Sequence, residues 1–224
     1  MLNVAIVDYG LGNLFSVKQA CERVGHLPLI SSQAEDLQHA DLVILPGVGA
    51  YSDAMNALRE LGLVAPIREL AHAGKPIIGI CLGLQLLMER SYEFGVHEGL
   101  GLLAGEVVRF PEVNRGSPLR VPHLCWNRVC AARGGAFAPE SPLTGLPDGV
   151  FMYFVHSYYV RPVDEALVQS RTTYGGVQFC SSVLCGQIFG CQFHPERSGA
   201  QGLAFYRNLA RFARSNRKEF QDVL

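Results

Sequence analysis

The sequence has little net charge and few charged residues. Lys and Arg number 19 against 20 Asp and Glu, a formal net charge of -1, and 17% of the 224 residues are charged. Such a balance lacks the basic excess that attracts nucleic acid or an acidic membrane surface, so we expect neither as a partner. The first eight residues contain no Lys or Arg and already include Asp8. We interpret them as a first strand and not as a signal peptide.

Long hydrophobic runs are also absent. The longest mostly apolar stretch, Ile77–Met88, is too short to cross a bilayer. Seven cysteines occur, an odd number with no secretory signal before them, which favours a reducing cytoplasm over an oxidising compartment. We therefore expect a cytoplasmic protein that is not embedded in a membrane.

A convincing set of metal ligands is missing as well. Cys125 and Cys130 are separated by four residues, as are Cys180 and Cys185, which is the loose end of zinc-ligand spacing. The surrounding residues are typical of strands, so we interpret these cysteines as small apolar side chains. We expect no metal and no organic cofactor.

What is present is an ordinary globular composition, 49% hydrophobic, in a chain of a length that suits one α/β domain over residues 1–224. Apolar, β-branched stretches alternate with helical patterns in the first ninety residues, and shorter strands follow up to a closing helix at about Gly199–Ser215. Alternation of this kind predicts a central, mostly parallel but mixed sheet with helices on both faces. The expected fold class is a flavodoxin-like, three-layer α/β fold.

One stretch, Pro76–Met88, carries the strongest chemical signal. A buried strand pattern leads to Cys81, which has Gly79 and Gly83 two residues to either side, and helical spacing then runs to Met88. This is the pattern of a nucleophile elbow, in which a side chain sits on a sharp strand-to-helix turn. A helix start beside the thiol would favour the thiolate. The alternative is a buried structural cysteine.

A base for such a nucleophile is offered near the end of the chain. His194 ends a strand pattern and is followed by Pro195 and Glu196. Proline keeps the preceding residue extended, and residues two apart in an extended chain point the same way, so the Glu196 carboxylate could orient the His194 imidazole. A structural His-Pro turn is the alternative reading.

Donors for an oxyanion are expected from two places. The backbone N–H of Leu82 follows the nucleophile directly. The loop Gly47-Val48-Gly49 leaves another predicted strand, and its glycines allow the backbone near Val48 and Gly49 to approach a ligand closely. Taken alone, that loop also fits an ordinary glycine turn.

Three motifs together resemble those of the class I (triad) glutamine amidotransferases. They are Gly79-Ile80-Cys81-Leu82-Gly83-Leu84-Gln85, Pro46-Gly47-Val48-Gly49 and His194-Pro195-Glu196, in the right order across the chain. Within that family, the resemblance extends over essentially the full length to the glutaminase subunits of imidazole glycerol phosphate synthase in L-histidine biosynthesis. Three further stretches carry this narrower resemblance: Asp8–Leu14, Pro122–Asn127 and Tyr153–Tyr158. Cys125 departs from the family pattern, where glycine usually precedes the tryptophan.

The resemblance implies a reaction and a set of roles. Cys81 would attack the side-chain amide of L-glutamine, with His194 and Glu196 completing the triad, to give L-glutamate and ammonia. It also implies a set of substrate-binding residues by position: Gly49, Gln85, Glu93, Ser157 and Tyr158. For Glu93, which suits the α-ammonium group, a solvated surface glutamate is the alternative.

The resemblance further implies a partner. In the family, ammonia passes to a cyclase subunit, a (β/α)8 barrel, in a heterodimer that makes imidazole glycerol phosphate and aminoimidazole carboxamide ribonucleotide. The family's glutaminase activity is switched on by the cyclase ligand. Asn13, Trp126 and Arg197 are the expected partner contacts. Core packing of Trp126 and a merely solvated Arg197 are the alternatives, and the family often has lysine at the latter position.

Two other functions fit parts of the sequence. One is the glutaminase subunit of another synthase, for anthranilate, aminodeoxychorismate or pyridoxal phosphate, which would share the triad but not the Tyr-Gly-Leu-Gly-Asn opening. The other is a non-catalytic redox sensor built on an elbow cysteine. The sensor explains Cys81 but leaves His194-Pro195-Glu196 without a role.

Overall fold

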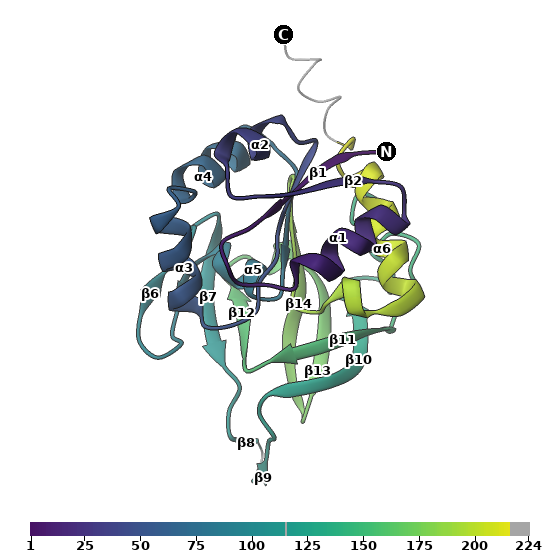
Figure 1. Ribbon diagram of the computed structural model, residues 1–224. Helices are drawn as coiled ribbons and strands as arrows, with labels where there is room; N and C mark the ends of the chain where they lie inside the picture. The colour runs from purple at the N-terminus through teal and green to yellow at the C-terminus, as the bar shows by residue number, and fades with distance from the viewer. Residues whose placement is uncertain (115, 216–224) are drawn as a thin grey trace.

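A nine-stranded mixed sheet forms the centre of the protein, as the computed structural model shows for residues 1–114 and 116–215 (Figure 1). The strand order is β11-β10-β13-β14-β15-β4-β3-β1-β2. Residues 216–224 of the expected domain lie outside the described residues.

Five neighbouring strands of this sheet are parallel. They are β15 (Ile188–Cys191), β4 (Ile77–Ile80), β3 (Leu42–Leu45), β1 (Asn3–Val7) and β2 (Leu27–Ser31). The inner ones are short, apolar and buried on both faces, as strands of a covered parallel sheet are. Their carboxyl ends share one edge of the sheet, where functional loops gather in folds of this kind.

The other four strands pair antiparallel. They are β14 (Val177–Cys185), β13 (Val168–Tyr174), β10 (His123–Ala131) and β11 (Val150–His156). β10 and β11 alternate buried and exposed residues over much of their length, so one side of this pair faces the core and the other faces outward. Within this sheet, parallel pairing is therefore confined to the five strands of the first group.

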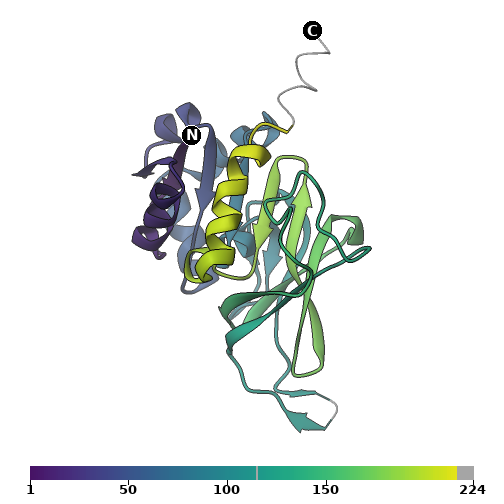
Figure 2. The same ribbon diagram turned by 90° about the vertical axis from the view of Figure 1, so that its right-hand side faces the viewer.

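Helices cover both faces of the parallel strands, which confirms the expected three-layer α/β fold. Helices α1 (Leu14–Arg23) and α6 (Gly199–Phe212) contact each other on one face (Figures 1 and 2). The other face carries the remaining helices: α2 (Ala34–His39), α3 (Tyr51–Glu60), α4 (Val64–His72) and α5 (Leu82–Leu86). Alternate residues of β1 pack into the two resulting cores, Val4 and Ile6 into one and Ala5 and Val7 into the other.

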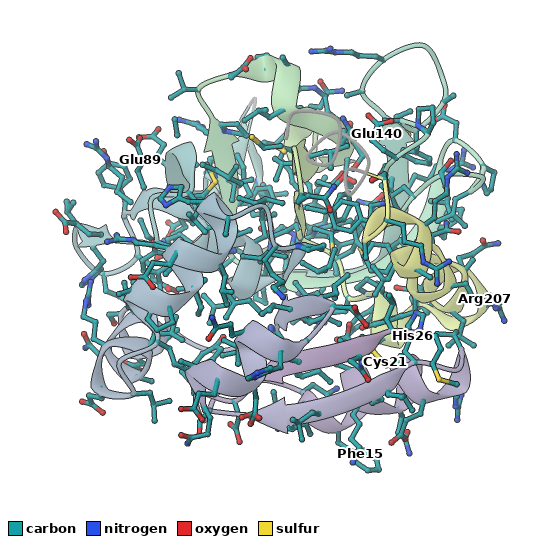
Figure 3. All side chains as sticks on the ribbon, turned by 90° about the horizontal axis from the view of Figure 1, so that it is seen from above. Phe15, Cys21, His26, Glu89, Glu140 and Arg207 are labelled. Carbon is teal, nitrogen blue, oxygen red and sulfur yellow. The ribbon has the colours of Figure 1, made fainter. Side chains whose placement is uncertain are left out.

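The connection between β1 and β2 contains α1 and packs against α6. Cys21 and His26 lie beside α6, and the His26 imidazole meets the backbone carbonyl of Tyr206 at 2.9 Å (Figure 3). Phe15, on the same helix as Cys21, points away from the body of the molecule and is 68% exposed.

A smaller sheet packs against β14 and helix α5. Its order is β12 (Tyr158–Pro162), β7 (Leu103–Arg109), β5 (Met88–Ser91) and β6 (His97–Glu98). The chain then forms a two-stranded hairpin, β8 (Val113–Asn114) and β9 (Ser117–Pro118), which projects from the end of the molecule away from the N-terminus (Figures 1 and 2). Two 3-10 turns complete the described elements, η1 (Glu165–Leu167) and η2 (Pro195–Arg197).

The segment after the elbow differs from the expected helix. Helix α5 ends at Leu86, and Met88 already belongs to β5, which pairs with β7. Every residue from Leu84 to Met88, including the polar Gln85, is buried. Helical spacing therefore carries no information about where such a helix ends, because any conformation would bury these residues.

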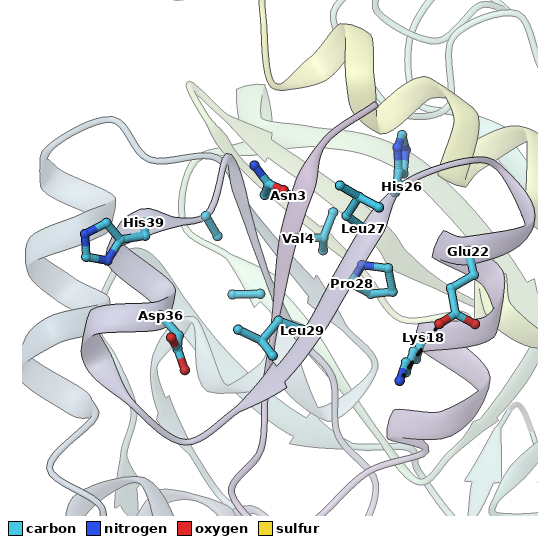
Figure 4. A pocket seen from close by; sticks show the side chains of 12 residues that line it. Asn3, Val4, Lys18, Glu22, His26, Leu27, Pro28, Leu29, Asp36 and His39 are labelled. Carbon is cyan, nitrogen blue, oxygen red and sulfur yellow. Dashed lines mark ion pairs between the residues drawn. The ribbon is translucent and has the colours of Figure 1, made fainter.

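A cavity of about 540 Å³ lies at the far edge of the large sheet. It runs along β2 between α1 and α2 and is lined by side chains that include Leu27, Leu29 and the Lys18–Glu22 ion pair (Figure 4). None of the expected site residues lines it. Among the described residues, no helix is both long and apolar enough to cross a membrane.

Candidate active site

Cys81 occupies the turn between β4 and α5 in a strained backbone conformation. Its φ of 54° and ψ of -105° are rare for a residue with a side chain. The flanking glycines are needed because a Cβ on Gly79 would come within 2.8 Å of the Leu84 nitrogen, and one on Gly83 would collide with the Leu45 carbonyl oxygen. The expected strand-turn-helix elbow is therefore present.

His194 and Glu196 lie at the adjacent strand end. His194 follows β15, the parallel neighbour of β4, and its Nδ1 is 2.8 Å from Oε1 of Glu196. Both side chains are almost completely buried, 4% and 1% exposed. Burial lowers the pKa of His194, but the Cys81 thiolate and the Glu196 carboxylate outweigh it and raise that pKa to about 11. Because Glu196 engages Nδ1, Nε2 is the ring nitrogen left to interact with Cys81.

Two residues that sequence reasoning missed hold His194 in place. The His194 backbone N–H donates to the Tyr153 carbonyl at 2.9 Å, and the Ser198 hydroxyl donates to the His194 carbonyl at 2.6 Å. The Tyr153 N–H in turn donates to the Ser198 hydroxyl at 3.0 Å. β11 and η2 are thus tied together around the base. No local sequence signal identifies Ser198, because the contact depends on a strand more than forty residues away.

A third missed residue lies next to the nucleophile itself. The Gln192 side-chain amide donates to the Cys81 sulfur at 3.5 Å, and Gln192 is fully buried. The Val155 carbonyl is 3.8 Å from the same sulfur. Gln192 directly follows β15, the strand that pairs with β4, and His194 lies two residues further on, so both side chains lie at the strand end next to Cys81.

A cavity of about 320 Å³ opens beside the Cys81 thiol. Eight of the expected site residues line it: Val48, Gly49, Cys81, Leu82, Gln85, Glu93, Ser157 and Tyr158. They come from four different loops or elements, so their meeting is a property of the fold. Pro122, Val155 and His156 complete the lining.

The expected oxyanion segment forms one wall of this cavity and is anchored at its start. The Tyr9 hydroxyl donates to the Pro46 carbonyl at 2.5 Å, and burial raises the pKa of Tyr9, which keeps the donor protonated. A Cβ on Gly47 would collide with that hydroxyl. Gly49 has a φ of 115°, a conformation that favours glycine. Val48 between them is 41% exposed.

Two expected substrate ligands already have protein partners. The Gln85 amide nitrogen donates to the Tyr158 carbonyl at 3.0 Å and to the Gln192 side-chain oxygen at 3.2 Å. The Glu93 carboxylate accepts the Tyr51 N–H at 2.6 Å, at the first turn of α3. Burial raises the pKa of Glu93 despite that bond. Glu93 is therefore not the freely solvated glutamate of the alternative reading.

The expected partner residues lie on an outward face near His194. Trp126 is 48% exposed and meets the Tyr153 ring edge-on at 6.2 Å, which excludes core packing for Trp126. The Arg197 guanidinium lies over the same Tyr153 ring at 5.0 Å. Asn13 lies at the start of α1, a helix that contacts η2, and its side-chain oxygen accepts the Ser16 N–H at 3.3 Å as a helix cap.

No group of three or more His, Cys, Asp or Glu side chains among residues 1–114 and 116–215 has an arrangement that could hold a metal ion. In that part of the chain Cys130 is exposed and Cys180 is buried, and all seven cysteines are free thiols.

This geometry agrees with the comparisons to known proteins. Residues 5–211 match the family described as Glutamine amidotransferase class-I. Two solved structures share the fold: a glutamine amidotransferase (TM-score 0.71, 20% identity, 94% of this chain and 98% of that one) and PurLQS from Thermotoga maritima (TM-score 0.70, 23% identity, the same coverage). The chain belongs to the class-I glutamine amidotransferase family.

Curated relatives narrow the assignment. The chain is 46% identical to the imidazole glycerol phosphate synthase subunit HisH of Moorella thermoacetica, over 96% of this chain and 97% of that protein. It is 47% identical to HisH of Geobacillus kaustophilus (94% and 97%) and 45% identical to HisH of Aquifex aeolicus (95% and 98%). It therefore groups with the HisH glutaminase subunits, which are enzymes, and the redox-sensor interpretation is set aside.

Proposed function

We propose that this protein hydrolyses L-glutamine to L-glutamate and ammonia through Cys81, His194 and Glu196. The observation that carries the proposal is the buried His194–Glu196 pair at 2.8 Å, which follows the end of β15, the strand next to the nucleophile elbow. A nucleophile, a base and a residue that orients the base are the parts that acyl transfer needs.

In the first half of the reaction, the Cys81 thiolate attacks the carboxamide carbon of glutamine. The carbonyl electron pair moves onto oxygen, where the Leu82 N–H and a donor from the Val48–Gly49 segment would stabilise the charge. The tetrahedral intermediate collapses, the carbon–nitrogen bond breaks, and His194 gives its proton to the departing nitrogen. Ammonia leaves, and a glutamyl thioester remains on Cys81.

In the second half, water attacks the thioester. His194, now neutral, accepts a proton from that water, and the sulfur leaves as thiolate when the carbon–sulfur bond breaks. The new carboxyl group loses its remaining proton to solvent, glutamate is released, and the thiolate and imidazolium are restored. The Glu196 carboxylate stabilises the imidazolium whenever His194 is protonated, because a nearby opposite charge favours the charged form of a buried group.

The cavity lining supports glutamine as the substrate. Glu93 supplies a carboxylate for the α-ammonium group, and Ser157 and Tyr158 form the wall beside Gln85. Gly49 also lines the cavity, and without a side chain its backbone can approach the substrate closely. A small amino acid suits a cavity of about 320 Å³.

We further propose that the ammonia passes to a cyclase subunit, a (β/α)8 barrel, that makes imidazole glycerol phosphate and aminoimidazole carboxamide ribonucleotide in cytoplasmic L-histidine biosynthesis. The name of the HisH relatives and the outward-facing aromatic and arginine side chains around Tyr153 support this. The partner and its nucleotide would activate the glutaminase by turning a peptide N–H of the Gly47-Val48-Gly49 segment toward the oxyanion.

Covalent capture of the nucleophile tests the proposed function. The glutamine analogue diazo-oxo-norleucine, added with the cyclase partner and its nucleotide, is expected to alkylate Cys81 alone among the seven cysteines. Mass spectrometry of the digested protein locates the label. Absence of label on Cys81 under these conditions would contradict the proposal, and full glutamine turnover by the isolated chain would contradict the activation step.

A further inference from the structure

Two buried histidines that the triad does not use form a hydrogen-bonded network at the wall of the cavity, which His156 helps to line. His123 on β10 and His156 on β11 face each other across the two strands, with His123 Nδ1 2.9 Å from His156 Nε2. His156 Nδ1 is 2.8 Å from the Tyr158 carbonyl oxygen. At the other end, the Asn127 amide nitrogen is 3.1 Å from His123 Nε2.

The Tyr158 carbonyl oxygen, at one end of this hydrogen-bond network, determines the direction of every bond in it. A carbonyl oxygen can only accept, so His156 carries its proton on Nδ1 and, when neutral, accepts at Nε2. His123 must therefore donate from Nδ1, which leaves its Nε2 to accept from the Asn127 amide. The amide has a second N–H, which donates to the Thr173 carbonyl at 3.0 Å. Both histidines are fixed in the Nδ1–H tautomer.

The same carbonyl connects this chain to the nucleophile. Tyr158 oxygen also accepts from the Gln85 amide nitrogen, whose other N–H donates to the Gln192 side-chain oxygen. The Gln192 amide nitrogen is then directed at the Cys81 sulfur. If either glutamine amide turned over, two donors or two acceptors would meet, so the Tyr158 carbonyl sets both orientations.

The surroundings keep the histidines neutral. His123 is fully buried and stacks between the rings of Phe154 and Tyr174, at 4.8 Å and 4.1 Å. Burial lowers the pKa of His123 to about 4. Burial, and next the positive charge that His123 would carry, lower the pKa of His156 to about 3. An imidazolium at either position would lose an acceptor nitrogen and break the chain.

We propose that His123 and His156 are positioning residues that orient the Tyr158 carbonyl, so that Gln85 presents its oxygen to glutamine and Gln192 presents an N–H to the Cys81 sulfur. The network begins at Asn127, on the inner side of β10 next to the outward-facing Trp126. It therefore links the strand that carries a proposed partner contact to the nucleophile. The kinetic consequences of this proposal rest on the proposed glutaminase function. The hydrogen-bond pattern is independent of that function.

The tautomers test the pattern directly in the unmodified full-length chain. Heteronuclear NMR of the ring nitrogens at neutral pH is expected to show both histidines neutral, each with a protonated Nδ1 and a bare, accepting Nε2. An Nε2–H tautomer or an imidazolium at either position would overturn the proposal. This measurement is independent of glutamine turnover, so it separates failure of the network from failure of the proposed function.

Variants at His156 test the kinetic role in the complex with the cyclase and its nucleotide. His156→Phe keeps the ring but removes both bonds, and we expect kcat/KM for glutamine to fall at least about tenfold, mainly through KM. His156→Asn retains a donor for the Tyr158 carbonyl and is expected to recover most of that loss. His26→Phe, the same change at a buried histidine outside the network, is the matched control with unchanged kinetics.

Gln192→Met completes the test at the nucleophile end. The thioether keeps the length of the side chain but cannot donate to the Cys81 sulfur, so we expect a lower kcat at an unchanged KM and slower alkylation of Cys81 by iodoacetamide. Wild-type kinetics in folded His156→Phe, or wild-type alkylation in Gln192→Met, would overturn the proposed positioning role.

Discussion

The imidazole of His194 and the carboxylate of Glu196 meet at 2.8 Å although only one residue separates them in the chain. The extended conformation of His194 before Pro195, with φ -104° and ψ 93°, turns both side chains to the same side. The carboxylate is 1% exposed, so its charge acts on the imidazole with little screening by water. The short segment His194-Pro195-Glu196 thus places a buried negative charge directly beside the His194 imidazole.

Replacing that charge is expected to reduce turnover with little effect on substrate binding. Glu196→Gln keeps the shape of the side chain but removes the negative charge that favours imidazolium, and its amide can present a donor to Nδ1 and select the wrong tautomer. We expect kcat to fall by about a hundredfold or more with KM within about twofold. Steady-state glutaminase kinetics of the complex check this, and an unchanged kcat would show that Glu196 does not act on the base.

Glu93 has two roles to separate, because its carboxylate lines the cavity and also accepts the Tyr51 N–H at 2.6 Å. Helix α3 has no side-chain cap of its own at Ala50. Glu93→Gln keeps an acceptor for Tyr51 but removes the charge that would bind the α-ammonium group. We expect it to raise KM for glutamine with the melting temperature unchanged, whereas Glu93→Ala also costs about 1 kcal/mol of stability through the lost cap.

Glutaramate, which is glutamine without its amino group, makes this separation sharp. Since glutaramate has no ammonium group to bind, Glu93→Gln should process it as the wild type does. The Glu93→Ala variant should still be slower if α3 and the adjoining Val48–Gly49 segment depend on the carboxylate. Equal loss in both variants on glutaramate would contradict a role confined to the ammonium group.

How far the sequence predicts this site depends on where its chemistry lies along the chain. Cys81 with its flanking glycines, and His194 with Glu196, are each contained in a few residues, so local geometry was enough to suggest them, while the resemblance of the three motifs together favoured a triad over the structural alternatives. Gln192 has no such signal. Its contact with Cys81 exists because β15 pairs with β4 in a register that places Cys191 opposite Ile80, which only the folded sheet determines.

The fold shows the same limit. The alternation of strand and helix patterns predicted the three layers. Where several consecutive residues are buried, however, the sequence does not indicate where one element ends and the next begins. Every residue from Leu84 to Met88 is buried, so the division of this stretch between α5 and β5 is decided by pairing with β7 rather than by an amphipathic pattern of its own. The His123–His156 contact likewise depends on β10 and β11 pairing across thirty-three residues.

The buried histidines predict how stability depends on pH. The pKa values of His123 and His156, lowered from 6.5 to about 4 and about 3, mean that the unfolded chain binds more protons below pH 6.5. Their contribution is therefore fully present above pH 6.5 and is lost as the pH falls toward about 4, by about 1.4 kcal/mol per pH unit for each histidine.

Urea unfolding at about pH 7, 6 and 5 measures that slope. His123→Asn removes one titrating group but retains a donor toward His156. Between about pH 7 and 5, the unfolding free energy of this variant should therefore change less steeply with pH, by the equivalent of about one proton. The same slope in the variant and the wild type would show that His123 is protonated in the folded protein, and it would contradict a neutral His123–His156 pair.

The outward face around Tyr153 predicts which residues bind the cyclase. Trp126→Ala and Arg197→Ala are expected to weaken the complex about 10- to 100-fold, because aromatic and arginine side chains dominate interface energies, while the isolated chain keeps its melting temperature. Leu29→Ala is the matched control, since Leu29 is 51% exposed on β2, at the opposite edge of the sheet from β11. Titration calorimetry with the cyclase gives the dissociation constants, and equal weakening by Leu29→Ala would contradict this assignment of the interface.

Transfer of the amide nitrogen tests the central claim most directly. The complex of this chain with the cyclase and its nucleotide is supplied with glutamine carrying heavy nitrogen in the side-chain amide, and the products are analysed by mass spectrometry. We predict one heavy nitrogen in each imidazole glycerol phosphate formed, one glutamate per product, and loss of both in Cys81→Ala, which should still allow synthesis from free ammonia. Heavy product formed by Cys81→Ala, or glutamate formed by the wild type without any heavy product, would contradict a Cys81-dependent transfer of ammonia to the partner.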